Sequence, residues 1–143
     1  MNQLGGTDAL PSTVLGVGID LVENKRMKET LEQWGTQFKN RVFTPAEQAY
    51  CDKKSAPWRH YAGRFAVKES VSKAFGTGIG KHVGWLDIEV TRNPDTGAPV
   101  SELRGKAKAL ADQKKVHRVL VSLSHTHDFA IAQAVLVGSQ SEV

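Results

Sequence analysis

Cysteine is almost missing from this chain, because Cys51 is the single cysteine among 143 residues. One cysteine forms no disulfide within the chain and builds no cysteine metal site, which indicates a reducing compartment. We therefore expect a cytoplasmic protein in which Cys51 is a half-buried helix residue.

Long apolar segments are missing too. No run of about 18 apolar residues occurs, and residues 1–13 lack the basic start and apolar stretch of a signal peptide. Repeats and low-complexity linkers are absent, so we expect one domain over residues 1–143 with frayed ends at 1–13 and 138–143. Hydrophobic residues make up 40% and charged residues 24%, which excludes a disordered or collagen-like chain.

Positive charge exceeds negative charge, with 19 Lys and Arg against 15 Asp and Glu and a net charge of +4. A basic balance of this size favours an anionic partner. Nucleic acid, an acidic protein and a phosphorylated cofactor all satisfy it.

Residues 14–22 alternate as a strand with one core face. Glycine is a poor strand residue, so a face built from glycines indicates that another group approaches the backbone closely there. One side carries Leu15, Val17, Ile19 and Leu21, and the other carries Gly16, Gly18 and Asp20.

Three helices are expected next. Residues 23–34 form an amphipathic stretch that carries Lys25, Arg26 and Lys28. A capping box with proline at the first helical position begins the second helix at Thr44. The third spans about residues 58–75 and ends at Gly76, since glycine readily adopts the left-handed conformation after a last turn.

The rest of the chain returns to strands. Two strands surround a turn at 93–97, a helix follows, and two apolar strands surround residues 125–128. This order predicts an α+β fold with a largely antiparallel sheet. The expected ranges are 86–91 and 98–103 for the first hairpin, 105–115 for the helix, and 119–124 and 129–137 for the last hairpin.

The third helix combines an apolar setting with charge. Apolar residues occupy nearly every side of it, which is typical of a buried helix. It nevertheless carries Arg64, Lys68, Glu69 and Lys73, and buried charges must be paired or bound to a ligand. Two interpretations stay open, a functional site and a surface ion pair between Glu69 and Lys73.

Asp20 also has two interpretations. A carboxylate at the end of a strand can cap the helix that follows. If Asp20 and Glu69 meet, they instead supply two hard oxygen ligands of the kind Mg²⁺ uses together with water and phosphate. Arg64, Lys68 and Lys73 nearby then suit a polyphosphate substrate.

The loop after the third helix and the last turn give weaker signals. Residues 76–80 fit neither the P-loop nor the Rossmann pattern, so this loop is a helix cap or a phosphate contact. His125 and His127 have no third nitrogen or sulfur ligand at a typical spacing, which disfavours zinc.

Four segments together resemble holo-[acyl-carrier-protein] synthase, the small bacterial type of 4′-phosphopantetheinyl transferase. The resemblance covers about residues 14–137, and the long helix motif with its Lys-Glu pair and later Lys is specific. The segments are GVGIDLVE at 16–23, RVFTPAE at 41–47, AGRFAVKESVSKAFGTGI at 62–79 and VSLSHT at 121–126.

The resemblance implies transfer of the 4′-phosphopantetheine arm of coenzyme A to a serine of apo acyl carrier protein, releasing adenosine 3′,5′-bisphosphate for fatty acid biosynthesis. It implies Mg²⁺ held by Asp20 and Glu69, with Glu69 and Lys73 as catalytic residues. It also implies a homotrimer with coenzyme A at protomer junctions. The implied coenzyme A contacts are Arg64, Lys68, Lys73, Gly76, Thr77, Gly78 and His125, and the implied carrier-docking residues are Lys25, Arg26 and Lys28.

Two alternatives belong to other classes. A basic nucleic-acid or anion-binding module fits the charge, but the basic residues form no aromatic-interleaved stripe. A phosphohydrolase using the same two carboxylates differs in taking water as the acceptor. We therefore expect neither a nucleic-acid partner nor a membrane partner.

Overall fold

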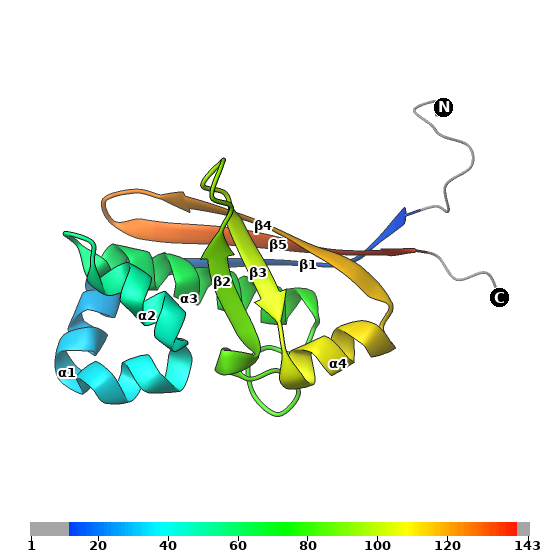
Figure 1. The fold of residues 1–143 in the computed structure, drawn as a ribbon, viewed down its shortest axis with the longest axis horizontal. Helices are drawn as coiled ribbons and strands as arrows, with labels where there is room; N and C mark the ends of the chain where they lie inside the picture. The colour runs from blue at the N-terminus through cyan, green and yellow to red at the C-terminus, as the bar shows by residue number, and fades with distance from the viewer. Residues whose placement is uncertain (1–11, 140–143) are drawn as a thin grey trace.

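A computed structural model describes residues 12–139 and has the predicted α+β architecture (Figure 1). Three strands form one antiparallel sheet in the order β1-β5-β4, and β2 and β3 form a separate two-stranded antiparallel sheet. In chain order the elements are β1 (Ser12–Glu23), α1 (Asn24–Val42), α2 (Pro45–Asp52), α3 (Pro57–Ala74), η1 (Trp85–Asp87), β2 (Ile88–Arg92), β3 (Pro99–Leu103), α4 (Gly105–Gln113), β4 (Val116–His125) and β5 (Phe129–Ser139).

The expected elements agree closely with these, and two differences have simple causes. Residues 12, 13, 138 and 139 were expected to fray, but they pair with one another in β1 and β5. The remaining predicted frayed residues lie outside the described range. The first helix runs on to Val42 because Gly35, at φ 51°, allows a kink that joins two helical pieces.

β1 packs its glycine side, and not its apolar side, against α3. A Cβ on Gly18 would overlap the carbonyl oxygen of Ser70, and one on Gly16 would overlap that of Ala74. The predicted close approach is therefore confirmed, and the approaching group is the backbone of α3. The apolar side was expected to face the core, which is wrong, since Val17, Ile19 and Leu21 are 57–62% exposed.

α3 packs alongside the three-stranded sheet (Figure 1), and its two ends contact different strands. Near its start, a Cβ on Gly63 would lie 2.7 Å from the His125 ring of β4. Near its end, Ser70 and Ala74 lie over β1. The predicted cap is present, because Gly76 follows the helix at φ 82° and donates to the Lys73 carbonyl oxygen at 2.9 Å.

Two hydrophobic clusters share α3 as a common wall. One lies between α3, β2, α4 and the sheet, and the other lies between α1, α2 and the first half of α3. Cys51 belongs to the second and is fully buried in α2, where burial raises the pKa of its thiol to about 12. Within residues 12–139, no helix has the length and apolar character of a membrane span.

Candidate active site

Asp20 and Lys73 meet where β1 passes α3. The Lys73 Nζ lies 3.1 Å from the Asp20 Oδ1 and donates to the Ile19 carbonyl oxygen at 3.2 Å. Among the described residues, the ion pair of Lys73 is thus with Asp20 and not with Glu69. The Asp20 side chain is 14% exposed and Lys73 is 49% exposed, so the carboxylate is sheltered while the ammonium reaches solvent.

Glu69 lies one helical turn before Lys73 and interacts with the same carboxylate. Partial burial raises the pKa of Glu69, the charge of Asp20 raises it further, and Lys73 lowers it. Two carboxylates therefore repel each other beside one ammonium, an arrangement that favours a cation between them.

Glu69 and Lys73 belong to the single solvent-facing stripe of α3. Phe65, Glu69 and Lys73 follow at four-residue spacing and are partly or fully exposed, whereas most other positions of the helix are buried. A hollow of about 290 Å³ begins at Asp20 and Phe65 and continues along α1 past Arg26 and Thr30.

The donor set suits a hard divalent cation. Among residues 12–139, no three His, Cys, Asp or Glu side chains gather into a metal-binding group. The Asp20 and Glu69 pair offers two carboxylate ligands, and the remaining positions would be filled by water and phosphate oxygens, as Mg²⁺ prefers.

Arg64 belongs to a second cluster, which is basic. The residue is 5% exposed, its guanidinium lies 4.1 Å from the centre of the Tyr50 ring, and its buried Nε has no hydrogen-bond partner within the described structure. His60 and His125 lie nearby with ring centres 6.1 Å apart. Burial lowers the pKa of both imidazoles, and Arg64 lowers both further.

The two clusters lie on different sides of α3. At about 100° per residue, Arg64 is roughly 140° from Glu69 and roughly 180° from Lys73 around the helix axis. Within one chain, Arg64 and His125 are therefore separated from the Asp20 carboxylate by α3. The pattern had suggested that these residues line one cleft, and the structure does not bring them together within one chain.

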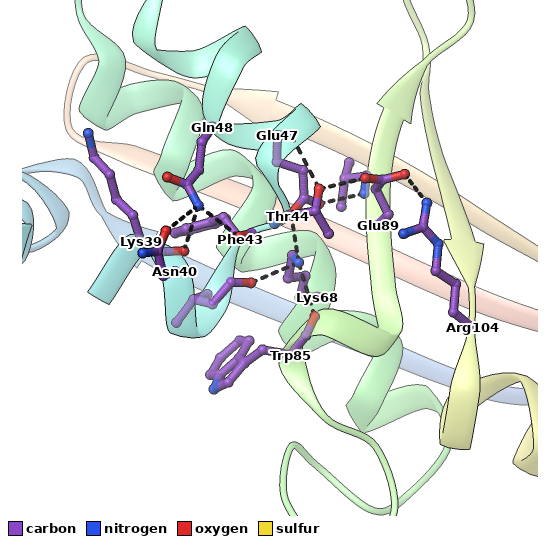
Figure 2. Close-up of polar contacts among 12 residues, drawn as sticks. Lys39, Asn40, Phe43, Thr44, Glu47, Gln48, Lys68, Trp85, Glu89 and Arg104 are labelled. Carbon is purple, nitrogen blue, oxygen red and sulfur yellow. Dashed lines mark hydrogen bonds and ion pairs between the residues drawn. The ribbon is translucent and has the colours of Figure 1, made fainter. Parts of the chain in front are cut away.

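Lys68 does not line a solvent cleft either. Its side chain is fully buried, and the Nζ lies 2.8 Å from the Glu47 Oε1, 2.9 Å from the Val42 carbonyl oxygen and 3.0 Å from that of Trp85 (Figure 2). An ammonium has three protons to donate, so these three acceptors leave none for a phosphate. The expected contact between Lys68 and coenzyme A is incompatible with this geometry.

The 76–78 loop uses its amides to cap α3. The N–H groups of Thr77 and Gly78 donate to the Ser72 carbonyl oxygen at 3.3 and 3.1 Å, and that of Gly76 donates to Lys73. Of the two interpretations of this loop, a helix cap and a phosphate contact, these three amides fit the helix cap. The Thr77 hydroxyl donates to the Gly78 carbonyl oxygen at 2.8 Å.

Comparison with known proteins places this chain in a family. Residues 16–134 match the family model described as the 4′-phosphopantetheinyl transferase superfamily. The chain belongs to this superfamily. The family and enzyme class predicted from the sequence are thereby confirmed.

Curated relatives of this transferase are similar over most of their length. The holo-[acyl-carrier-protein] synthase of Caldanaerobacter subterraneus is 44% identical over 125 residues, which cover 87% of this chain and 96% of that protein. The synthase of Syntrophus aciditrophicus is 46% identical over 125 residues, which cover 87% and 97%.

Solved structures share the fold. The Helicobacter pylori synthase in complex with coenzyme A is 34% identical with a TM-score of 0.75, over 84% of this chain and 98% of that one. The Bacillus anthracis synthase, solved with CoA (3′,5′-ADP), is 38% identical with a TM-score of 0.73, over 88% and 98%.

The basic residues of α1 divide between two faces of this transferase. Arg26 lines the hollow that begins at Asp20. Lys25 and Lys28 line a different hollow, and the Lys28 Nζ lies 4.5 Å from the centre of the Trp58 ring. The structure thus separates Arg26 from the two lysines with which the sequence grouped it.

Sequence reasoning missed the far end of the site. A hollow of about 470 Å³ lined by Thr30, Trp34, Phe38 and Arg41 shares Thr30 and Phe38 with the hollow at Asp20. The signal was available, because Arg26, Thr30 and Trp34 repeat every four residues and so share one helix face. Tyr50, which stacks on Arg64, carried no comparable signal.

Proposed function

We propose that this transferase moves the 4′-phosphopantetheine arm of coenzyme A onto a serine hydroxyl of apo acyl carrier protein. The reaction releases adenosine 3′,5′-bisphosphate and supplies holo carrier protein for fatty acid biosynthesis. The observation that carries the proposal is the convergence of Glu69 and Lys73 on Asp20, which itself lines a groove. The names and ligands of the relatives support the same choice of substrates.

Asp20 and Glu69 are the proposed ligands of one Mg²⁺. When bound, the ion supplies positive charge to the pyrophosphate oxygens of coenzyme A. The support is the paired carboxylates, whose mutual repulsion contributes to the raised pKa of Glu69. Lys73, now paired with Asp20 at 3.1 Å, would exchange that carboxylate for a phosphate oxygen once a cation is present.

In the reaction the serine oxygen forms a bond to the phosphorus that carries the pantetheine arm. The bond from that phosphorus to the bridging pyrophosphate oxygen breaks, and the nucleotide keeps the electron pair. Lys73 stabilises the negative charge that develops there. The serine proton passes to Glu69 or to a water held beside it, both of which lie at the solvent-facing stripe of α3.

Arg64 and His125 are proposed to bind coenzyme A in the site of a neighbouring copy. Arg64 faces away from Glu69, is almost fully buried, and has an Nε without a partner in the described structure. The apolar side of β1 is left exposed, with Val17 at 62% and Ile19 at 58%. A face of this kind marks an interface, which supports the homotrimer.

The carrier protein is proposed to dock along α1. The two joined hollows run from Asp20 past Arg26 to Trp34 and Arg41, so an arginine lies toward each end and apolar residues lie between them. An acidic protein whose reactive serine enters at Asp20 fits this charge pattern. Lys25 and Lys28, which the sequence grouped with Arg26 for docking, line a different hollow.

Intact-mass spectrometry of an apo carrier protein tests the reaction. The protein is incubated with coenzyme A and Mg²⁺, and we expect the carrier to gain the mass of one phosphopantetheine arm. EDTA, Asp20→Ala and Glu69→Ala should each abolish the gain. Cleavage of coenzyme A without any gain of carrier mass would show a hydrolase instead, and no turnover with several carriers would refute the proposed transfer.

A further inference from the structure

α3 carries Glu69 and Lys73, yet its own surface does little to set its rotation. Eleven of its 18 residues are buried, and they lie on nearly all sides apart from the Phe65, Glu69 and Lys73 stripe. An amphipathic helix is oriented by its one apolar face. A helix that is apolar on most sides has no single face of this kind, so a directional polar contact adds to side-chain packing in fixing its orientation.

Lys68 provides that contact. It is the residue immediately before Glu69, and its ammonium joins three segments outside α3 (Figure 2). The Val42 carbonyl lies at the end of α1, Glu47 lies in the first turn of α2, and the Trp85 carbonyl lies in η1. The last carbonyls of a helix have no partner within it and favour a cation.

Glu47 is itself held rigidly, so it makes a firm anchor. Its Oε1 accepts from the Thr44 amide at 2.8 Å, and its Oε2 accepts from the Val90 amide at 2.6 Å. The Thr44 hydroxyl donates to Glu89 at 2.5 Å, and Glu89 also pairs with Arg104. The Lys68 ammonium is therefore attached to a network that reaches α2 and β2.

Small rotations of α3 matter at the carboxylates. With a carboxylate about 6 Å from the helix axis, a rotation of about 20° displaces it by roughly 2 Å. Functional constellations tolerate errors of only about 0.5 Å. On the opposite side, Gly16 and Gly18 set how closely α3 approaches β1, but a smooth glycine track leaves rotation free.

We propose that Lys68 is a positioning residue that sets the rotation of α3 and so places Glu69 against Asp20. The inference rests on the proposed function only for its catalytic readout. A buried ion pair stabilises a fold little compared with a well-packed apolar pair, and its best-attested use is to specify one arrangement. Loss of Lys68 should therefore damage the site more than the fold.

The test is the double variant Lys68→Met/Glu47→Gln, which removes both charges together. We expect Mn²⁺ affinity without coenzyme A, measured by electron paramagnetic resonance, to fall about tenfold, as for outer groups that orient metal ligands. In the transfer assay kcat should fall at least as much, with KM for the carrier within about threefold. Wild-type turnover separates failure of the proposed function from failure of the inference.

Two variants serve as controls. Glu47→Gln alone removes the counter-charge of a buried ammonium, so it should lower thermal stability. It keeps the two carbonyl contacts of Lys68, so we expect its Mn²⁺ affinity to stay within threefold of wild type, a difference of about 0.7 kcal/mol or less. Arg104→Met/Glu89→Gln removes a pair of the same network that does not touch α3. It should change thermal stability without changing Mn²⁺ affinity.

Unchanged Mn²⁺ affinity in a folded Lys68→Met/Glu47→Gln protein would overturn the inference. So would a loss of affinity of equal size in Arg104→Met/Glu89→Gln. If the double variant does not fold, Lys68→Gln replaces it, because its side chain is one atom shorter and keeps an uncharged donor. Wild-type Mn²⁺ affinity in folded Lys68→Gln would then count against a positioning role.

Discussion

The ammonium of Lys73 forms an ion pair with the Asp20 carboxylate, with 3.1 Å between Nζ and Oδ1. The divalent cation proposed for this site would therefore have to compete with Lys73 for Asp20. Lys73→Met should leave Mn²⁺ affinity in the absence of coenzyme A unchanged or tighter, since a competing cation is removed. The same variant should lower kcat/KM by roughly 10²-fold, because a donor to the developing charge is lost.

Titration calorimetry with Mn²⁺ and a mass-based transfer assay give the two quantities. Lys106→Met is the matched control, because the Lys106 Nζ contacts the Lys81 carbonyl oxygen away from the site. Weaker Mn²⁺ binding in Lys73→Met would contradict the proposed competition.

Gly18 fixes the separation of β1 and α3, because an added Cβ would overlap the Ser70 carbonyl oxygen. Backbone atoms cannot move aside as a flexible side chain can, so Gly18→Ala must displace the helix. We expect a destabilisation of about 1–3 kcal/mol in urea unfolding, together with loss of Mn²⁺ binding. Gly84→Ala is the control, since its Cβ would lie 3.3 Å from a movable Asp87 side chain; wild-type stability in Gly18→Ala would contradict the close approach.

Much of this architecture could be predicted from the sequence. The capping box at Thr44 and the left-handed Gly76 specify helix ends through local hydrogen bonds. Such bonds join residues close in the chain, so a single sequence is enough to predict them. The inner face of β1 was mispredicted because hydrophobicity suggested Val17 and Ile19, whereas close helix approach selects glycine.

The site was only partly predictable for a different reason. The sequence does not distinguish the roles of Arg64, Lys68 and Glu69, since all three are charged residues on a buried helix. Lys68 ends in a buried ion pair with Glu47, a contact between residues 21 apart in the sequence, and no local pattern encodes it. The angular separation of Arg64 and Glu69, in contrast, follows from helix geometry alone.

His60 and His125 should titrate below the ordinary value of 6.5. Burial is the larger cause and Arg64 the next, so Arg64→Met should raise the pKa of both rings toward 6.5 without reaching it. The imidazole proton shifts in a pH series of NMR spectra give both pKa values.

These two histidines also make stability depend on pH. Because the folded pKa is below 6.5, the unfolded chain binds more protons in the window between the two values. Their contribution to stability is therefore complete above pH 6.5 and is lost as pH falls through the folded pKa. Thermal unfolding at pH 7.5 and 5.5 should show the decrease, and a smaller decrease in His60→Gln/His125→Gln; an equal decrease would assign it to other groups.

A site shared between copies predicts complementation. Asp20→Ala and Arg64→Met should each be inactive alone, because they damage opposite halves of the site. Mixed assemblies should regain activity at about a quarter of the sites, those that combine one intact half from each of two neighbouring copies. The measurement is carrier modification after the two variants are co-refolded, with Asp20→Ala and Glu69→Ala as a pair that should not complement.

The proposed assembly would use the exposed side of β1. Ile19→Glu places a charge on a side chain that is 58% exposed in the single chain, so it should not unfold the protomer but should prevent a neighbour from packing there. Light scattering should give the protomer mass of 15.6 kDa for the variant and a multiple for the wild type. A wild-type mass of one active protomer would rule out the shared site.

Trp34 lies at the far end of the groove that begins at Asp20, and it is 54% exposed. An exposed tryptophan beside Arg41, in a groove joined to the hollow at Asp20, is typical of a binding hot spot. Trp34→Ala should raise KM for the carrier protein about 10- to 30-fold while kcat stays near wild type, because docking is weakened and the reacting groups are untouched.

Val100→Ala, at an exposed apolar residue of β3, should change neither constant. If Trp34→Ala instead lowers kcat at saturating carrier, the groove orients the serine rather than anchoring the partner, and docking must depend chiefly on Arg26.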